Sequence, residues 1–292
     1  MTDLQERYLQ SIQEDYPDLS IHDVSFNSHE GQYNDLLIIN DQLIFRFPKF
    51  EAGLITLRRE VGLLELLQGT LTLAIPRPVY LSRNTKTVGK VYMGYHKIKG
   101  DPLWHPRFQS IKDQQVLAKM ASQLAAFLRE LHAVPVDQLE LDLAINDLPQ
   151  EWAKMYAEIR HYLFSKMRPD ARDMVARHFE TFLDHSEAHP FEPTLRHGDF
   201  GSGNILYDQQ AQSISGIIDF GFAGLGDPAV DIAAAMTFGE SFFNYYYASY
   251  PGMTELVERA TFYKGTFAIQ EALYGVKHDD QEAFERGIAA YK

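Results

Sequence analysis

Three polar residues within residues 194–231 have the types and the spacing that phosphoryl transfer requires. Asp199 is followed five positions later by Asn204, and Asp219 begins an Asp-Phe-Gly tripeptide. Two short apolar runs on either side of a polar turn at residues 208–212 predict a β-hairpin between Asn204 and Asp219. The hairpin would place one carboxylate before its first strand and another after its second, so all three side chains would converge.

These three side chains can divide the work of phosphoryl transfer. The reaction needs a carboxylate to accept the proton of the acceptor hydroxyl, and oxygen ligands for the Mg²⁺ that neutralises the phosphates. Asp199 can take the first role, and Asn204 and Asp219 can supply the metal ligands. A lone aspartate is more often a turn or capping residue, but this combination is the catalytic arrangement of protein kinases.

The composition is that of a globular chain. Its 292 residues, 45% of them hydrophobic, suffice for one large domain or two packed lobes. No apolar run is long enough to cross a membrane, and the first residues are charged where a leader would be basic and apolar, so we expect a cytoplasmic protein. The absence of cysteine excludes disulfides, thiolate zinc sites and a cysteine nucleophile.

The net charge narrows the class of partner. At −13 the chain repels phosphodiester backbones and attracts cations. A cationic small substrate fits this charge, although a general gain in solubility explains it equally well. We expect a monomer with a small hydroxylated, cationic substrate and without a nucleic-acid or membrane partner.

The elements before residue 100 would position a nucleotide. Apolar spacing predicts an amphipathic helix over 3–16. Short β-like runs follow at 20–26, 36–39 and 43–47, and they predict an antiparallel meander with a turn at Asn40-Asp41.

Several residues of this region are candidates for binding the nucleotide phosphates. Ser28 and Gly31 lie in the loop between the first two strands, which could fold over the phosphates or be a plain hairpin turn. Arg46 stands where a kinase-like fold needs a cation, with Glu60 of the next helix as its partner. Lys49 is the second candidate for this cation. The alternative for Arg46 is that it is a surface residue of an edge strand.

The segment at about residues 95–100 resembles a hinge between two lobes, because an extended strand runs there into Lys-Gly-Asp-Pro. Backbone groups of His96 and Ile98 could bond a purine edge, and Tyr95 would stand at the back of the base pocket. The choice between ATP and GTP depends on how that side chain closes the pocket, so it stays open.

The rest of the chain outside the hairpin is predicted to be mainly helical. Asp231 is expected to brace the backbone of the loop that carries Asp199, Asp227 to form a turn or cap, and His132 to be structural. The expected helices cover residues 115–132, 148–164, 170–186, 230–238, 254–274 and 281–291.

With these residues placed, the whole chain resembles the aminoglycoside phosphotransferases, most closely the 2''-phosphotransferase group. The segments that carry the resemblance are 30–31, 44–49, 97–100, 127–132, 217–221 and 273–275. The resemblance implies an α+β, bilobal, protein-kinase-like fold. Its β-rich N-lobe would cover residues 1–99, and a mainly helical C-lobe with the catalytic loop and acceptor site would cover 100–292. It also implies ATP or GTP as donor, Mg²⁺, and Asp199 as the carboxylate that meets the acceptor hydroxyl.

The acceptor is less well defined than the reaction. Relatives that bind aminoglycoside ammonium groups tend to carry an acidic residue directly after Asp-Phe-Gly, where this chain has Phe222. Glu240 and Glu271, together with Asp199, are the candidate acceptor contacts. We expect an antibiotic-resistance kinase acting on an aminoglycoside. The alternatives are a kinase of another small alcohol, such as a macrolide or amino-alcohol metabolite, and a nucleotide-binding pseudokinase-like module.

Overall fold

The chain forms two compact units. The computed structural model describes residues 2–27, 33–84, 86–136, 143–188 and 190–292. Within these residues the first unit comprises 2–130 and 201–223, and the second comprises 131–136, 143–200 and 224–292. The lobe boundary predicted near residue 100 stays a prediction.

The first unit is built on an antiparallel sheet with the strand order β1-β2-β3-β5-β4. Alternate residues of β2 are buried, which is the pattern of a strand with one face on a core. Asn40 and Asp41 join β2 to β3 with φ of 55° and 50°, as a tight hairpin turn requires. The predicted meander is therefore confirmed, although its first strand begins later than expected. The strands are β1 (Val24–Asn27), β2 (Asn34–Ile39), β3 (Leu43–Pro48), β4 (Tyr80–Leu81) and β5 (Met93–His96).

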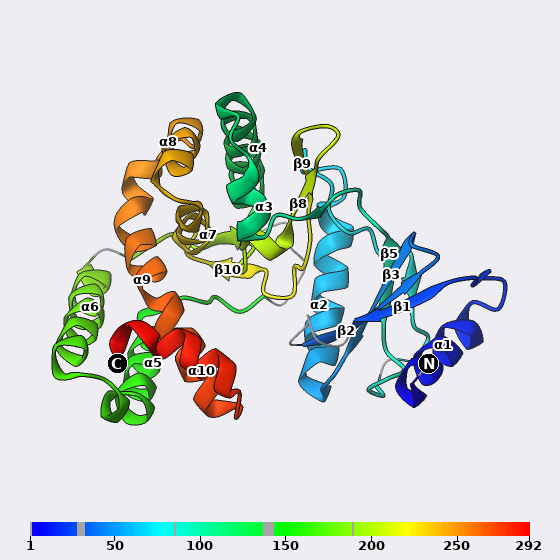
Figure 1. Ribbon diagram of the computed structural model, residues 1–292, viewed down its shortest axis with the longest axis horizontal. Helices are drawn as coiled ribbons and strands as arrows, with labels where there is room; N and C mark the ends of the chain where they lie inside the picture. Colours follow the sequence, from blue (N-terminus) through cyan, green and yellow to red (C-terminus); the bar gives the residue numbers. More distant parts are fainter. Residues whose placement is uncertain (1, 28–32, 85, 137–142, 189) are drawn as a thin grey trace. The chain divides into compact units, whose positions relative to one another are not determined.

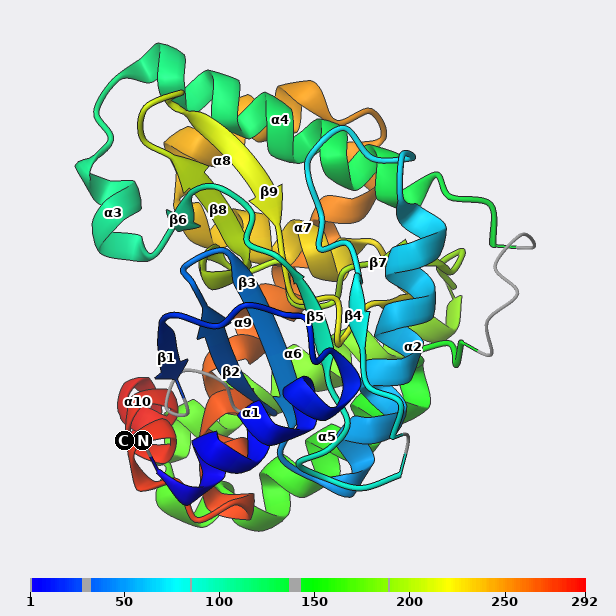
Figure 2. The same cartoon turned by 90° about the vertical axis from the view of Figure 1, so that its right-hand side faces the viewer.

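Helices α1 (Asp3–Asp15) and α2 (Glu51–Leu67) lie on opposite faces of this sheet (Figures 1 and 2). Tyr8 of α1 stacks on Phe47 of β3 with ring centroids 4.0 Å apart, within a buried apolar cluster. Successive strand residues point to opposite faces, so Arg46 points away from this cluster and meets Glu60 of α2.

Tyr16 forms hydrogen bonds with the edge strand β4 of the same sheet. Strand β4 is the last in the strand order. The Tyr16 hydroxyl, just beyond α1, accepts a hydrogen bond from the Leu81 N–H at 2.8 Å and donates to the Leu81 carbonyl at 2.9 Å. One side chain thus satisfies both outward-facing backbone groups of an edge-strand residue.

The predicted hairpin is also part of the first unit. Strands β8 (Ile205–Asp208) and β9 (Ser213–Ile217) pair antiparallel, and the Asp208 side chain accepts from two backbone N–H groups of the turn between them. The short β6 (Asp101–Pro102) adds a third strand beside β8. Helices α3 (His105–Ser110) and α4 (Gln114–His132) precede the hairpin along the chain.

The second unit is mainly helical. Strands β7 (Thr194–Arg196) and β10 (Gly224–Gly226) pair within it. The long α9 packs on α5, α6, α7 and α10 (Figure 1). The helices are α5 (Pro149–Tyr162), α6 (Pro169–Ala188), α7 (Ala229–Ala235), α8 (Glu240–Ser249), α9 (Met253–Lys277) and α10 (Gln281–Ile288). Among the described residues, none of the helices combines the length and apolarity of a membrane span.

Candidate active site

The two ends of the β8–β9 hairpin lie next to each other in the first unit. The Asn204 carbonyl accepts a hydrogen bond from the Ile218 N–H at 2.9 Å, so Asn204 lies beside the residue that precedes Asp219. Asp219 has a φ of 62°, a left-handed conformation that aspartate tolerates better than most residues. The structure thus brings the two predicted metal ligands together, while their role in binding metal stays a prediction.

Arg46 connects the sheet, α2 and the hairpin. Its side chain is 4% exposed, so it is not the surface residue of the alternative interpretation. One guanidinium nitrogen, Nη1, is paired with Glu60, and the other, Nη2, donates to Asp219 Oδ1 at 2.7 Å. Glu60 Oε1 also accepts from the Phe220 N–H at 3.1 Å. The structure therefore brings together three residues that the sequence predicts for the nucleotide site.

Burial and charge act against each other in this cluster. Burial disfavours the charged guanidinium of Arg46, but the charges of Glu60 and Asp219 outweigh it and raise the pKa of Arg46. Burial raises the pKa of Glu60, and the Arg46 charge opposes that rise. Burial likewise raises the pKa of the Tyr95 hydroxyl, which stays protonated at neutral pH. The cluster places a permanent cation beside Asp219.

The remaining candidates for phosphate binding do not join this cluster. Lys49 Nζ lies 3.5 Å from Asp35 Oδ1, and Asp35 also accepts from the hydroxyl of Tyr8 at 2.7 Å. Lys49 is thus on the α1 side of the sheet, opposite Arg46. Ser28 and Gly31 fall outside the described residues.

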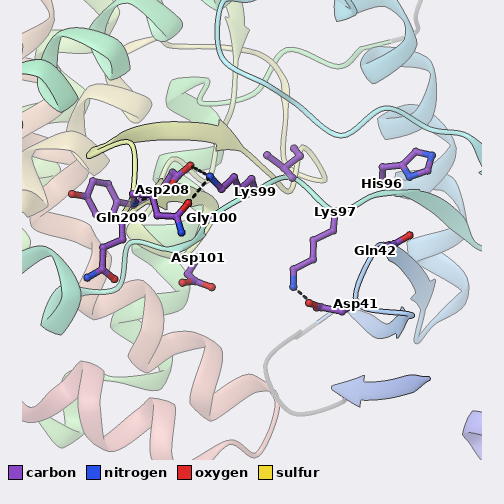
Figure 3. A pocket seen from close by; sticks show the side chains of 12 residues that line it. Asp41, Gln42, His96, Lys97, Lys99, Gly100, Asp101, Asp208 and Gln209 are labelled. Atoms are coloured by element: carbon purple, nitrogen blue, oxygen red, sulfur yellow. Dashed lines mark hydrogen bonds and ion pairs between the residues drawn. The ribbon is translucent and has the colours of Figure 1, made fainter. Parts of the chain in front are cut away.

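A pocket of about 860 Å³ lies along the predicted hinge in the first unit (Figure 3). His96 and Ile98 line it, as do the β2–β3 turn and the turn of the β8–β9 hairpin. Lys97 is paired with Asp41, and Lys99 lies 2.8 Å from Asp208. Both lysines of the pocket are therefore neutralised by carboxylates, and the Lys97 N–H is also engaged, donating to the Gln42 carbonyl at 2.8 Å.

Gly100 holds the hinge close to the hairpin. Its φ is 109°, and a Cβ at this position would lie 2.5 Å from Ser215 Oγ and 2.9 Å from the Tyr207 carbonyl oxygen. The Ser215 hydroxyl donates to the Lys99 carbonyl. Both the backbone conformation and the close approach require a residue without a side chain.

The loop that carries Asp199 is braced by Asp231 in the second unit. The buried Asp231 carboxylate accepts from the His197 N–H at 2.7 Å, the Gly198 N–H at 2.8 Å and His132 Nε2 at 3.1 Å. Burial alone would raise the pKa of Asp231, but the hydrogen bond and charge of His132 lower it. The predicted structural roles of Asp231 and His132 are confirmed by these contacts.

Asp199 is exposed and follows this braced backbone directly. Its N–H donates to His197 Nδ1 at 3.3 Å. Asp199 belongs to the second unit, whereas Asn204 and Asp219 belong to the first. The predicted convergence of all three side chains therefore stays a prediction.

A second pocket, of about 360 Å³, adjoins the same loop within the second unit. Arg196 and Gly198 line it, so it begins one residue before Asp199. The other lining residues come from the segment before α5, from α5, α7 and α9: Asn146, Asp147, Glu151, Trp152, Met155, Val230, Tyr263, Phe267 and Gln270. Our sequence interpretation predicts helices at 148–164 and 170–186 but assigns them no functional residue, so it misses this pocket.

The base of this pocket is held by an ion pair between distant segments. Asp147 accepts from Arg196 Nε at 2.5 Å and from Nη2 at 3.1 Å. Asn146 donates its backbone N–H to the Leu225 carbonyl at 2.8 Å, which ties the same segment to β10. The available sequence signal is the Asn-Asp pair ahead of Pro149, which is typical of a turn into a helix.

Asp227, directly after β10, contacts α9. As predicted, it acts as a cap, with Oδ1 accepting from the Ala229 N–H at 2.9 Å. It also pairs with Arg259 Nε at 2.6 Å and accepts from the Tyr263 hydroxyl at 2.8 Å. These contacts fix the α9 face that forms one wall of the pocket.

The predicted acceptor residues Glu240 and Glu271 lie away from the lining of this pocket. Glu240 is the exposed first residue of α8. Glu271 is a surface residue of α9 that accepts from Arg286 Nε at 2.8 Å. The structure does not bring either of them to the residues that line the pocket.

The oxygen donors at the hairpin ends suit a small hard cation. Within the described ranges, no group of three or more His, Cys, Asp or Glu side chains could hold a metal ion. One carboxylate and one amide, from Asp219 and Asn204, fit Mg²⁺, which usually keeps waters and takes its other ligands from substrate phosphates.

An N-terminal antiparallel sheet with a buried Arg–Glu pair, followed by the β8–β9 hairpin and a helical remainder, is the arrangement of kinase-like phosphotransferases. A family model described as the phosphotransferase enzyme family matches residues 28–259. The chain belongs to this family.

Individual relatives agree with this assignment. Viomycin phosphotransferase from Streptomyces vinaceus is 28% identical over 273 residues, which cover 90% of this chain and 91% of the relative. The GDP and kanamycin complex of APH(2")-IIIa matches with a TM-score of 0.88 and 27% identity, covering 97% of this chain and 96% of that one. Macrolide 2'-phosphotransferase type I matches with a TM-score of 0.74 at 20% identity, covering 100% and 98%, and shows the fold alone. The predicted kinase-like fold is confirmed.

Proposed function

We propose that the protein transfers the γ-phosphate of ATP or GTP to a hydroxyl of an aminoglycoside antibiotic and so confers resistance. The observation that carries the proposal is the buried Arg46 held between Glu60 and Asp219, because it fixes a cation and a carboxylate where donor phosphates and their metal would meet. The relative solved with GDP and kanamycin supports the choice of donor and acceptor class.

In this proposal the donor binds along the first unit. Backbone groups of His96 and Ile98 contact the purine in the hinge pocket, and Tyr95 lies behind it. Arg46 contacts the phosphates, with Ser28 and Gly31 of the loop above them and Lys49 as a secondary contact. Asn204 and Asp219 would hold Mg²⁺, which would neutralise part of the phosphate charge.

Asp199 is the proposed catalytic residue. Its carboxylate accepts the proton of the acceptor hydroxyl as the oxygen attacks the γ-phosphorus and the bond to the β–γ bridging oxygen breaks. Asp231 contributes by fixing the backbone of residues 197–198, so that the carboxylate of Asp199 needs little reorganisation. Glu240 and Glu271 are the further proposed contacts to acceptor cations, although neither lines the pocket of the second unit. We expect the protein to be cytoplasmic and monomeric.

The test is transfer of labelled γ-phosphate from ATP and from GTP to a panel of kanamycin, gentamicin, streptomycin, viomycin, a macrolide and choline. Transfer to an aminoglycoside supports the proposal. Transfer only to viomycin, the macrolide or choline replaces the acceptor and keeps the reaction. Nucleotide binding without transfer to any alcohol would favour a pseudokinase-like module, against which the intact Asp199, Asn204 and Asp219 argue.

A further inference from the structure

The hydrogen bonds around Asp231 extend through His132 to the end of α8. His132 is the last residue of α4, and its Nε2 lies 3.1 Å from Asp231 Oδ2. Its other ring nitrogen, Nδ1, lies 2.7 Å from the hydroxyl of Tyr250, the residue directly after α8. The two rings are 5.9 Å apart between centroids and are tilted by 62°. All three residues belong to the second unit, as does the loop that carries Asp199.

The direction of each hydrogen bond follows from the charge of Asp231. Burial alone would raise the pKa of this carboxyl, but its hydrogen bond with His132 lowers it, so the group is ionised at neutral pH. An ionised carboxylate only accepts hydrogen bonds, so Nε2 of His132 must carry a proton. In the neutral imidazole Nδ1 is then an acceptor, and the Tyr250 hydroxyl donates to it.

The Tyr250 hydroxyl therefore selects one tautomer of His132. Which nitrogen of a histidine is protonated depends on the hydrogen bond that the other nitrogen makes. With the proton on Nδ1 instead, Nε2 would point a lone pair at the carboxylate, and Asp231 would lose a donor. His132 is 9% exposed and Asp231 is fully buried, so water has little access to take the place of Tyr250.

The same carboxylate holds the backbone directly ahead of Asp199. Asp231 Oδ2 accepts from the His197 N–H at 2.7 Å, and Oδ1 accepts from the Gly198 N–H at 2.8 Å. Both contacts require one orientation of the carboxylate, and the third donor, His132, helps to fix that orientation. A hydroxyl at the end of α8 is thus connected to the loop by one imidazole and one carboxylate.

We propose that Tyr250 is a positioning residue for Asp199. Its hydroxyl fixes the tautomer of His132, His132 orients Asp231, and Asp231 holds the backbone from which the Asp199 side chain extends. The inference rests on the proposed function, since the position of Asp199 matters most if its carboxylate accepts the hydroxyl proton. It deepens that function by giving the end of α8 a part in orienting the proposed base.

The first test compares Tyr250→Phe with two matched variants of α8, Tyr246→Phe and Tyr247→Phe. Each removes one phenolic hydroxyl. The Tyr247 hydroxyl is 2.6 Å from Thr254 Oγ1 on the surface, and the buried Tyr246 hydroxyl has no hydrogen-bond partner in the described part of the chain. With kanamycin and ATP as probes, Y250F should lower kcat roughly fivefold, as expected for one lost hydrogen bond. Both KM values should stay near those of the controls, and equal kcat in the three variants would overturn the proposal.

The second test reads the hydrogen bonds without any reaction. In protein labelled with ¹⁵N at histidine, the shifts of the ring nitrogens distinguish the two tautomers, and His132→Gln identifies the signals of His132. Y250F should reduce the tautomer protonated at Nε2. It should also speed amide exchange at His197 and Gly198 roughly fivefold, whereas Y247F leaves both readouts at wild-type values. A tyrosine that served only in packing would not move the tautomer, so an unchanged tautomer or unchanged exchange would overturn the proposal.

The His132→Gln variant also tests the order of action. Glutamine can still donate to Asp231, but it has no tautomers for Tyr250 to select. In the H132Q background Y250F should therefore cause no further loss of kcat. The same fivefold loss in both backgrounds would show that Tyr250 acts by another route and would overturn the proposal.

These readouts separate the inference from the proposed function. A changed tautomer and faster exchange in Y250F, in a protein that transfers phosphate to no alcohol, would support the positioning of this loop by Tyr250 and overturn the assigned reaction. Phosphate transfer that Y250F leaves at the wild-type kcat would overturn the inference and keep the kinase.

Discussion

Arg46 is a guanidinium at the place where a kinase-like fold ordinarily uses a lysine. Its planar group has separate N–H donors for two acceptors, and here one nitrogen serves Glu60 and the other serves Asp219. A lysine ammonium is a compact point charge on a different stem and cannot reproduce this fork. The residue therefore orients Asp219 as well as supplying charge.

Arg46→Lys should consequently weaken nucleotide binding although the charge is kept. Loss of one hydrogen bond between charged groups costs about 1.5–3 kcal/mol, so we expect the nucleotide KM to rise roughly tenfold or more. Steady-state kinetics with varied ATP and GTP measure it. Arg83→Lys is the matched control, because Arg83 is exposed and pairs with Asp15 away from this cluster. An R46K protein with unchanged nucleotide KM would show that the fork is dispensable.

Asp199→Asn should separate binding from turnover. The amide keeps the size of the side chain but cannot accept the hydroxyl proton, so kcat should fall by about 10²-fold or more. Nucleotide affinity, followed by thermal stabilisation on adding ATP or GTP, should match the wild type. Substantial kcat in this variant would count against Asp199 as the base.

The lowered pKa of Asp231 predicts how the stability of the folded protein depends on pH. Its pKa is lowered in the folded protein, so the unfolded chain binds this proton more readily and the folded state gains stability as pH rises through that window. The gain is fully present above the unfolded pKa of about 3.9 and is lost as pH falls through the lower folded value.

Urea unfolding of the wild type and of Asp231→Asn at several pH values tests this dependence. The difference in unfolding free energy should be constant between about pH 5 and 7 and should shrink below about pH 4. A difference that grows in acid would contradict the assigned pKa direction.

At the scale of elements, the contact of the hinge with the β8–β9 hairpin depends on Gly100. Gly100→Ala should destabilise the protein by strain and by its clash with the Tyr207 carbonyl and Ser215. Gly69 provides the control, since its φ is 79° but a Cβ there meets nothing within 4 Å. Gly69→Ala should cost about 1–2 kcal/mol of backbone strain, and G100A clearly more. Urea unfolding measures the free energy of unfolding of both variants. Equal losses of stability would show that the clash at Gly100 relaxes.

The elements that the sequence predicts well are those with strong local signals. The Asn40-Asp41 turn and the β8–β9 hairpin follow from turn residues between apolar runs, which act over a few positions. Helix α8 is not among the predicted helices, because its aromatic residues have weak helix propensity. Its stability comes from burying Phe242 and Tyr246, four positions apart, against other parts of the second unit.

At the scale of the molecule, the stretch that we propose to carry the chemistry, residues 194–231, has residues in both units. The chain passes from the second unit to the first after residue 200 and returns after residue 223. Spacing along the sequence predicts which residues could act together in the reaction. It cannot indicate the pocket beside Asp199, because that pocket depends on Asp147 meeting Arg196 and on Asn146 meeting Leu225, far apart in the chain.

The net charge of −13 should act on the two substrates with opposite signs. Raising the ionic strength from about 0.05 to 0.3 M screens the attraction of a cationic acceptor and the repulsion of an anionic nucleotide. We expect the kanamycin KM to rise and the nucleotide KM to fall or stay level, with kcat changing little. Steady-state kinetics in a potassium chloride series measure both, and a parallel rise of the two KM values would indicate general inhibition by salt.

The hydroxyl of Tyr16 has a consequence for behaviour at high concentration. An uncovered edge strand offers its backbone to other chains and is a starting point for intermolecular sheets. By occupying both outward groups of Leu81, this phenol removes that template. At Leu81, strand addition is thus blocked by a hydroxyl group that takes no part in the proposed chemistry.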